Sequence, residues 1–171
     1  KTGYDLIDLR WPDFIADELD ISHTKLPMVL LPGEWMGLVG DDAAHESGLP
    51  AGMPIYAGAT DGTAGQLASG AALPGEWNST LGTTLVFKGI SSRLLPDSQG
   101  RVYYHRHPEG WWMPGGASNT GTEWILRDHP GEDLEALNRE AESLLPTGLL
   151  RYPLAKRGER FPFVCPEAEG F

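Results

Sequence analysis

The sequence has little cysteine and no long hydrophobic run, and each absence excludes a class of protein. Cys165 is the single cysteine among 171 residues, which excludes an intrachain disulfide and a cysteine-based zinc site. A reducing, cytoplasmic compartment is expected, and Cys165 itself is expected to be a small buried hydrophobic side chain. No stretch of about 18 apolar residues is present, so no membrane-spanning helix is predicted.

Basic residues are also scarce: 13 Lys and Arg stand against 24 Asp and Glu, which gives a net charge of −11. This balance disfavours general binding to nucleic acids or anionic membranes. It does not exclude an anionic ligand, because backbone N–H groups can hold a phosphate without Lys or Arg. The first residues, Lys1-Thr-Gly, lack a methionine and a signal-peptide pattern, which predicts a chain that begins inside a longer protein or after processing.

Local patterns along the chain predict a mixed α and β protein with a domain boundary at 73–76. In the helix expected at 41–47, Asp41 is the expected N-cap and Gly48 the expected end. The part before the boundary holds too few strands for a complete sheet, so its apolar edges should be exposed unless another segment covers them. The expected elements are helices at 11–21, 41–47, 63–71, 119–127 and 132–145, extended segments or strands at 26–31 and 53–58, of which 53–58 should be buried, and antiparallel strands within 77–89 and 101–114.

The first candidate for chemistry is Asp61 in Gly58-Ala-Thr-Asp-Gly-Thr-Ala-Gly. A carboxylate after a buried strand, flanked by residues of little bulk, can meet a ligand closely and take a proton from a hydroxyl. The alternative is that Asp61 is the N-cap of the following helix, and spacing alone favours this alternative because Asp is a preferred cap residue.

Two further glycine-containing motifs are candidates for binding a phosphate or a nucleotide. Ser79-Thr-Leu-Gly-Thr-Thr-Leu-Val presents consecutive N–H groups and two hydroxyls, although it is no Walker loop and an ordinary hairpin turn explains it equally well. Pro114-Gly-Gly-Ala-Ser-Asn-Thr-Gly precedes an expected helix, and small residues there suit contact with an anionic ligand. The alternative, a helix entry capped by Ser118 or Asn119, is favoured when this motif is taken alone.

Other polar and aromatic features have structural interpretations. His105 and His107 alternate on an expected strand, and an exposed strand face is favoured over a metal site because no third ligand has a suitable spacing. Tyr103-Tyr104 and Trp111-Trp112 are expected to pack across neighbouring strands. Arg160 is expected in a structured loop, paired with an acid.

Taken together in this order and separation, these segments resemble the middle of an FGGY carbohydrate kinase, over essentially the whole chain. The later segments resemble the subgroup of xylulokinase-like proteins that act as D-ribulose kinases. The segments that carry the resemblance are 26–34, 48–62, 79–84, 115–119, 152–154 and 158–163.

The resemblance implies a ribonuclease H-like (actin-like) fold in which two domains close over a cleft, and a reaction of Mg²⁺-bound ATP with a sugar. Asp61 would contact the sugar and act as the general base on its terminal hydroxyl, so that the oxygen attacks the γ-phosphorus in line. The sugar would be a ketopentose such as D-ribulose or D-xylulose, or a related polyol. The implied nucleotide-binding residues are Gly82, Thr83 and Thr84 against the β- and γ-phosphates, Gly116 beside the nucleotide, and either Asn119 or Thr120.

The chain departs from the family pattern in what it omits. The family's N-terminal phosphate loop, its sugar-binding residues and its C-terminal adenosine-binding segment are not in this sequence. The chain is therefore expected to be the central third of a kinase, with residues 1–74 ending the first domain and residues 75–171 beginning the nucleotide-binding domain. The expected partners are a sugar, ATP and the remaining parts of the kinase, and the oligomeric state stays open between a monomer and a homodimer.

Two other functions stay open beside the kinase. The chain would be an inert fragment, or part of a sugar- or nucleotide-binding module without catalysis, if the parent protein has lost activity. A hydrolase that uses Asp61 to activate water would share the actin-like fold, and it would turn over ATP without any sugar.

Overall fold

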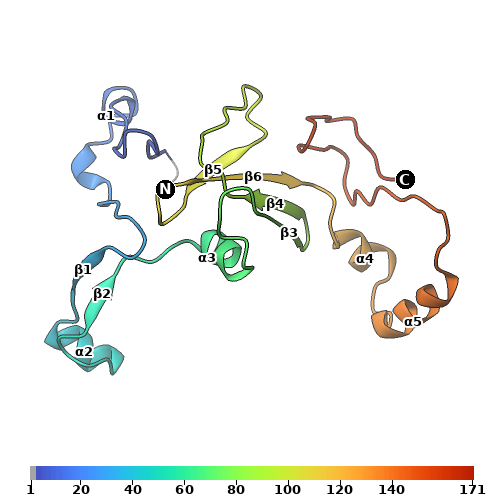
Figure 1. Ribbon diagram of the computed structural model, residues 1–171, viewed down its shortest axis with the longest axis horizontal. Helices are drawn as coiled ribbons and strands as arrows, with labels where there is room; N and C mark the ends of the chain where they lie inside the picture. Colours follow the sequence, from blue (N-terminus) through green and yellow to red (C-terminus); the bar gives the residue numbers. More distant parts are fainter. Residues whose placement is uncertain (1–2) are drawn as a thin grey trace.

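A four-stranded antiparallel sheet lies at the centre of the computed structural model, which describes residues 3–171 (Figure 1). The strand order is β3-β4-β6-β5, so the two inner strands are β4 and β6. The register places Gly115 of β6 between Lys88 of β4 and Tyr103 of β5. The four strands are β3 (Trp77–Leu81), β4 (Leu85–Gly89), β5 (Tyr103–Arg106) and β6 (Trp112–Ser118).

Different segments cover the two faces of this sheet. Paired residues share a face and alternate residues point to opposite faces, so Lys88 lies on one face and the pair Leu85–Ser118 on the other. Helix α3 (Asp61–Ala68) packs on the Lys88 face, where the Lys88 ammonium donates a hydrogen bond to the Gly62 carbonyl. The segment 152–171 packs on the Ser118 face, where the Ser118 hydroxyl donates to the carboxylate of Glu159.

A second, two-stranded sheet lies to one side of the central sheet (Figure 1). It pairs β1 (Trp35–Leu38) with β2 (Pro54–Tyr56), and α2 (Asp41–Ser47) lies between them in the chain. Helix α2 ends as expected at Gly48, in left-handed conformation with φ of 74°, but its N-cap is Gly40 and not Asp41. The expectation of a buried strand at 53–58 is wrong, because every residue of β2 is exposed.

Most of the expected helices form with shifted ends. Helix α1 spans only Phe14–Asp17, because the chain turns away soon after and Asp20 has a φ of 53°. Helix α3 begins earlier than expected, at Asp61, while the segment 26–31 is extended without strand pairing. The remaining helical elements are a 3-10 turn at His23–Lys25, α4 (Glu123–Asp128) and α5 (Leu134–Leu144).

The expectation of a helix entry at Pro114–Gly121 is wrong, because most of this motif is the inner strand β6. Hydrogen bonding to β4 and β5 on both sides outweighs the local preference for a helix start. The glycines serve sheet packing instead of a helix entry. A Cβ on Gly115 would lie 2.7 Å from the Tyr103 ring, and a Cβ on Gly116 would lie 2.3 Å from the Phe161 ring.

The histidines are less exposed than the sequence predicts. His107 is buried and its ring lies 4.9 Å from that of Trp111, while His105 is half-buried and contacts Thr63 of α3. Within residues 3–171, no group of three metal-ligating side chains is found. The predicted cross-strand packing is confirmed for Tyr104 and Trp112, whose rings meet edge to face at 6.2 Å.

The two remaining expectations concern the C-terminal segment. Cys165 is half-buried and not fully buried, and its backbone exchanges hydrogen bonds with that of Glu159. Arg160 lies in a loop, as expected, but its guanidinium donates to the carbonyl oxygen of Ala117 at 2.8 Å and makes no ion pair with an acid among residues 3–171.

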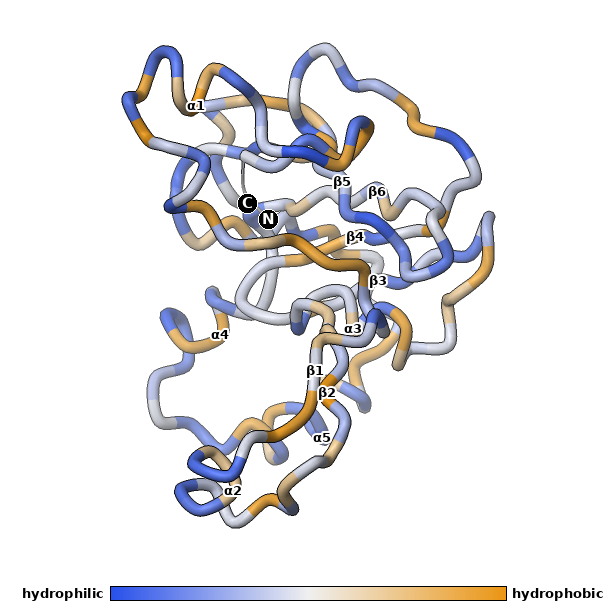
Figure 2. Tube along the Cα trace, turned by 90° about the vertical axis from the view of Figure 1, so that its left-hand side faces the viewer, coloured by the Kyte–Doolittle hydropathy of each residue, from blue (hydrophilic) through white to orange (hydrophobic). Residues whose placement is uncertain are grey.

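The hydrophobic core is small for a chain of this length. Figure 2 shows hydrophobic stretches distributed along the whole trace, and large apolar side chains of β1, β2 and α5 are exposed. The exposed apolar edges predicted for the first part of the chain are confirmed, and exposure extends beyond that part. No helix within residues 3–171 is long and apolar enough to cross a membrane. The buried hydrophobic residues are Ile15, Val39, Ile90, Met113 and Leu154.

Candidate functional site

Asp61 is the first residue of α3, and its carboxylate is exposed. The N-cap is Thr60, which has an extended backbone, so the interpretation of Asp61 as the helix cap is wrong. Oδ1 of Asp61 accepts a hydrogen bond from the N–H of Gly62 at 2.7 Å. A carboxylate in this position is stabilised by the positive end of the helix dipole. Asp61 is therefore held at the helix start as an accessible acceptor of hydrogen bonds or of a proton.

Two side chains of the central sheet hold the first turn of α3. The Lys88 ammonium donates to the Gly62 carbonyl at 2.8 Å, and the Thr63 hydroxyl lies 3.3 Å from Nδ1 of His105. Thr60 also donates its hydroxyl to that of Thr63 at 3.1 Å. Gly62 and Thr63, the two residues that follow Asp61, are thus anchored by side chains that lie far along the chain.

Sequence reasoning missed Lys88, although one signal was available. It is the single charged residue in the otherwise apolar strand β4, and its side chain is buried, with 7% of the residue exposed. Burial lowers the pKa of the Lys88 ammonium below its usual range, while the nearby carboxylate of Asp61 opposes this shift. Burial also lowers the pKa of His105, and the neighbouring charge of Lys88 acts in the same direction.

The turn between β3 and β4 lies against the loop that follows β6. The N–H and the hydroxyl of Thr122 both donate to the Gly82 carbonyl, at 2.8 and 3.0 Å. The Leu85 N–H donates to the Thr120 carbonyl, and a Cβ on Gly121 would lie 2.1 Å from the Thr83 carbonyl oxygen. Two of the sequence motifs therefore meet in space, and their contact requires a glycine at position 121.

The predicted nucleotide-binding residues lie in different surroundings. Thr83 is exposed at the tip of the turn, whereas the Gly82 N–H donates within the turn to the Thr84 carbonyl at 3.1 Å. Gly116 is buried beneath Phe161, as described above. Asn119 is half-buried, and its side-chain amide donates to the Gly158 carbonyl at 2.9 Å. Thr83 is thus the most accessible of these residues.

Thr120 is buried, in contrast to Asn119, and it belongs to a hydrogen-bonded cluster around Glu159. Its hydroxyl lies 2.7 Å from that of Ser118, which donates to the Glu159 carboxylate. The same carboxylate accepts hydrogen bonds from the Asn119 N–H and the Tyr152 hydroxyl. Glu159 thus fixes the start of the loop after β6.

Asp61 and the turn at Gly82–Thr84 lie towards opposite ends of β4. Lys88 contacts the first turn of α3, whereas Leu85 is the first residue of β4 after the Gly82–Thr84 turn. These two residues are roughly 10 Å apart along the strand. No hydrogen bond joins Asp61 directly to Gly82, Thr83 or Thr84 within the part of the chain that is described. The arrangement offers a proton acceptor at one end of the strand and backbone donors and hydroxyls at the other.

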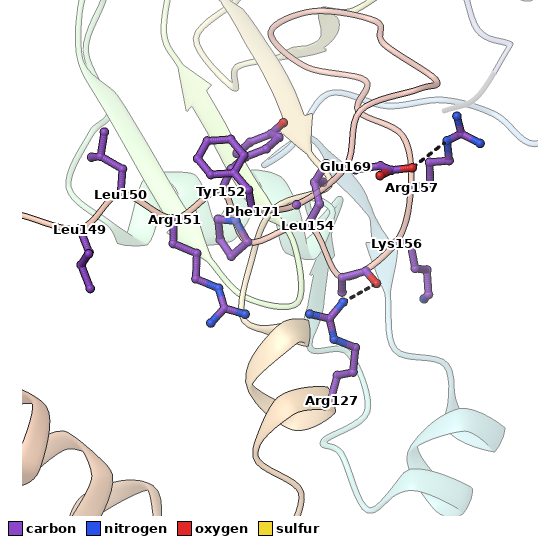
Figure 3. Close-up of a pocket in the computed structure, with 13 residues that line it drawn as sticks. Arg127, Leu149, Leu150, Arg151, Tyr152, Leu154, Lys156, Arg157, Glu169 and Phe171 are labelled. Carbon is purple, nitrogen blue, oxygen red and sulfur yellow. Dashed lines mark hydrogen bonds and ion pairs between the residues drawn. The ribbon is translucent and has the colours of Figure 1, made fainter.

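A hollow of about 570 Å³ lies elsewhere, between α4 and the C-terminal segment (Figure 3). The basic side chains on its wall already have partners. Arg127 donates to the Ala155 carbonyl, and Arg157 pairs with Glu167. None of the predicted site residues lines this hollow. It is therefore distinct from the predicted site.

Comparison with known proteins matches the chain over nearly its whole length. It is 27% identical to a gluconokinase of Bacillus subtilis over 95% of this chain, and 26% identical to a xylulose kinase of Escherichia coli over 97%. The crystal structure of a xylulose kinase from Rhodospirillum rubrum superposes with a TM-score of 0.79 and 26% identity over 99% of this chain. These similarities to sugar kinases support the predicted resemblance to the FGGY carbohydrate kinase family.

The match covers only part of each of these relatives. The chain spans about a third of the length of the curated relatives, 34% of the gluconokinase and 35% of the xylulose kinase. No protein-family model matches the sequence. The predicted mixed α/β, actin-like fold is confirmed, and a ligand-bound xylulose kinase from Lactobacillus acidophilus has the same fold with a TM-score of 0.81 at 19% identity.

Proposed function

We propose that this chain is the central segment of a kinase that transfers the γ-phosphoryl group of ATP to a sugar hydroxyl, with Asp61 as the general base. The observation that carries the proposal is the exposed Asp61 carboxylate at the start of α3, held by the sheet that also bears the Gly82–Thr84 turn. The names of the relatives, xylulose kinase and gluconokinase, support a sugar as the acceptor.

In the proposed reaction, the Asp61 carboxylate accepts the proton of the attacking hydroxyl. The sugar oxygen forms a bond to the γ-phosphorus, the bond from that phosphorus to the β–γ bridging oxygen breaks, and ADP leaves. Thr83 and Thr84 would hold the phosphates through their hydroxyl and N–H groups. Gly82, Gly116 and Asn119 would shape the same nucleotide site, through the contact between the turn and the loop after β6.

We propose further that residues 1–74 end one domain and residues 75–171 begin the nucleotide-binding domain of a cytoplasmic enzyme. The change from β1–β2 and α3 to the four-stranded sheet near residue 75 supports this division. Magnesium is proposed to enter with ATP. Mg²⁺ at phosphoryl-transfer sites is held largely by the phosphates of the substrate and by water.

For the acceptor we favour a ketopentose such as D-ribulose or D-xylulose. The similarity to xylulose kinases of Escherichia coli and Bacillus subtilis supports this choice, whereas the similarity to a gluconokinase keeps gluconate among the acceptors to be tested. A panel of ketopentoses, aldoses, gluconate and glycerol, assayed with the full-length protein, identifies the acceptor. ATP turnover that does not depend on any sugar would favour a hydrolase instead.

Replacing Asp61 tests the proposed base. In the full-length protein, Asp61→Asn should lower kcat for sugar-dependent ADP production by about 10² to 10⁴, because the proton acceptor is removed. Asp41→Asn is a matched control, since Asp41 is the first residue of α2 as Asp61 is of α3, and it should leave kcat unchanged. Normal turnover by Asp61→Asn would refute the assignment.

A further inference from the structure

Lys88 occupies a place that disfavours an ammonium group. Its side chain is buried under α3, and a charged amine loses hydration when it is buried. It also lies beside the N-terminal turn of α3, where the helix dipole is positive. A lysine that contributes to stability alone is usually found at the surface, where its ammonium keeps its hydration.

Two groups on α3 compensate for this placement. The Gly62 carbonyl accepts a hydrogen bond from Nζ at 2.8 Å, and Asp61, the preceding residue, supplies the opposite charge. The fit is tight, because a Cβ on Gly62 would lie 3.1 Å from Nζ. The ammonium is thus matched to the backbone and the charge of the residues at the start of α3.

We propose that Lys88 is a positioning residue for Asp61: its ammonium fixes the first turn of α3 on the sheet and holds a positive charge beside the carboxylate. This inference rests on the proposed function, in which Asp61 is the base. Lys88 lies on β4, three residues after Leu85, the first residue of the strand after the Gly82–Thr84 turn. The same strand therefore connects the proposed base to the proposed phosphate-binding turn. Strand β4 thereby fixes the position of Asp61 relative to the turn.

The charged and titratable groups around Lys88 come from two elements. Asp61 faces it from α3, and His105 and Tyr103 lie on β5, on the same face of the sheet. Burial lowers the pKa of His105 and raises that of Tyr103, so both shifts favour neutral side chains. Asp61 and Lys88 are then the charged pair of this cluster near neutral pH.

Lys88→Met tests the inference, because it keeps the length of the side chain and removes the charge. In the full-length protein it should lower kcat by about 10-fold to 100-fold, the loss expected when a catalytic group is misplaced, with KM for ATP nearly unchanged. Lys88→Arg keeps a cation and should restore part of the loss. Lys156→Met is a matched control, because Lys156 is exposed and pairs with Glu123 at the surface.

The pH profile separates a charge effect from a packing effect. Activity of the wild type should fall at alkaline pH as Lys88 loses its proton, below the usual lysine value of about 10.4. Arginine stays charged, so Lys88→Arg should move this decline to higher pH, and Lys88→Met should lack it. Wild-type kcat and an unchanged alkaline limb in Lys88→Met would overturn the inference.

A measurement without turnover distinguishes failure of this inference from failure of the proposed function. The N–H groups of Thr63 and Ala64 donate to the Thr60 carbonyl in the first turn of α3. Their hydrogen exchange should be faster in Lys88→Met than in the wild type or in Lys156→Met, whether or not the protein phosphorylates a sugar. Equal exchange in all three proteins would overturn the positioning role, while an inactive wild type with faster exchange in Lys88→Met would refute only the kinase.

Discussion

Lys88 and Glu159 are buried charged residues that lie on opposite faces of the central sheet, in surroundings of different kinds. The Lys88 ammonium is balanced by one carbonyl and one neighbouring carboxylate. The Glu159 carboxylate instead accepts hydrogen bonds from two hydroxyls and from backbone N–H groups, including those of Asn119 and Arg160. Buried charges with this many donors serve structure, which is why Glu159 is a candidate for stability and Lys88 for function.

Glu159→Gln should destabilise the fold by on the order of 3 kcal/mol, because it removes the charge from a site built of donors. Burial by itself raises the pKa of the Glu159 carboxyl, but hydrogen bonds from Ser118 and Tyr152 and from the backbone outweigh it and lower the pKa to about 2. Chemical unfolding of the full-length protein at neutral pH measures the loss of stability. Glu169→Gln, at an exposed ion pair, should change little.

The contribution of Glu159 to stability depends on pH, and the direction follows from the lowered pKa of its carboxyl group. Because the pKa of Glu159 is lower in the folded state than in the unfolded state, its stabilisation is present in full above about pH 4.5 and is lost as the pH falls towards about 2. The wild type should therefore lose more stability than Glu159→Gln over this interval. Parallel acid-unfolding curves would contradict this role of the carboxylate.

At the scale of elements, the contact between the β3–β4 turn and the loop after β6 decides how the candidate nucleotide site is built. The Gly82 carbonyl accepts two hydrogen bonds from Thr122, so the turn is held by a residue of another motif. Gly121 packs directly against the backbone of this turn, where there is no room for a side chain. A hairpin turn alone would not have this restraint.

Gly121→Ala should displace the turn, because its Cβ would lie 2.1 Å from the carbonyl oxygen of Thr83, which is backbone and cannot rotate away. We expect KM for ATP to rise by about 10-fold or more, because the groups proposed to bind the phosphates would move, with a smaller effect on KM for the sugar. Gly40→Ala is the control, because a Cβ there meets nothing within 4 Å. An unchanged KM for ATP would argue against a nucleotide site at this turn.

At the scale of the whole molecule, the exposed surface is large. The chain exposes 12005 Å², whereas a compact monomer of 18.6 kDa exposes roughly 8,200 Å². The apolar face of α5 is part of this excess: Leu144 is 63% exposed, although the helix is amphipathic and Asp133 caps its start through two N–H groups. Apolar surface of this extent is normally covered by other parts of a protein.

The 171-residue chain by itself should therefore bind a hydrophobic dye such as ANS strongly and should bind neither ATP nor D-ribulose tightly. The reason is that two elements, β1–β2 and α5, lack the partners that would bury them. Dye fluorescence and calorimetry, compared with the full-length protein, measure both effects. Tight binding of either ligand by the chain alone would show that these 171 residues hold a complete site for that ligand.

The sequence by itself determined the features that depend on neighbouring residues. Gly48 ends α2, the Gly-Thr-Thr segment turns between β3 and β4, and Asp61 begins a helix of small residues, all within a few positions of the signals that predict them. The order of these motifs was also sufficient to predict the kinase family and its fold. The roles of Asp61 and of the nucleotide-binding residues stay predictions.

Only the tertiary structure decided which residues meet across the sheet. Pro114–Ser118 is a strand and not a helix entry, because strands distant in the sequence bond to it on both sides. Glu159 reaches Ser118 across 41 positions, and Lys88 reaches Gly62 across 26. Local patterns carry no information about such contacts, since the free energy that selects them comes from burial and hydrogen bonds formed only when the distant segments pack together. Asp61 is therefore recognisable from its own neighbours, whereas the lysine that holds its helix is recognisable only in the folded chain.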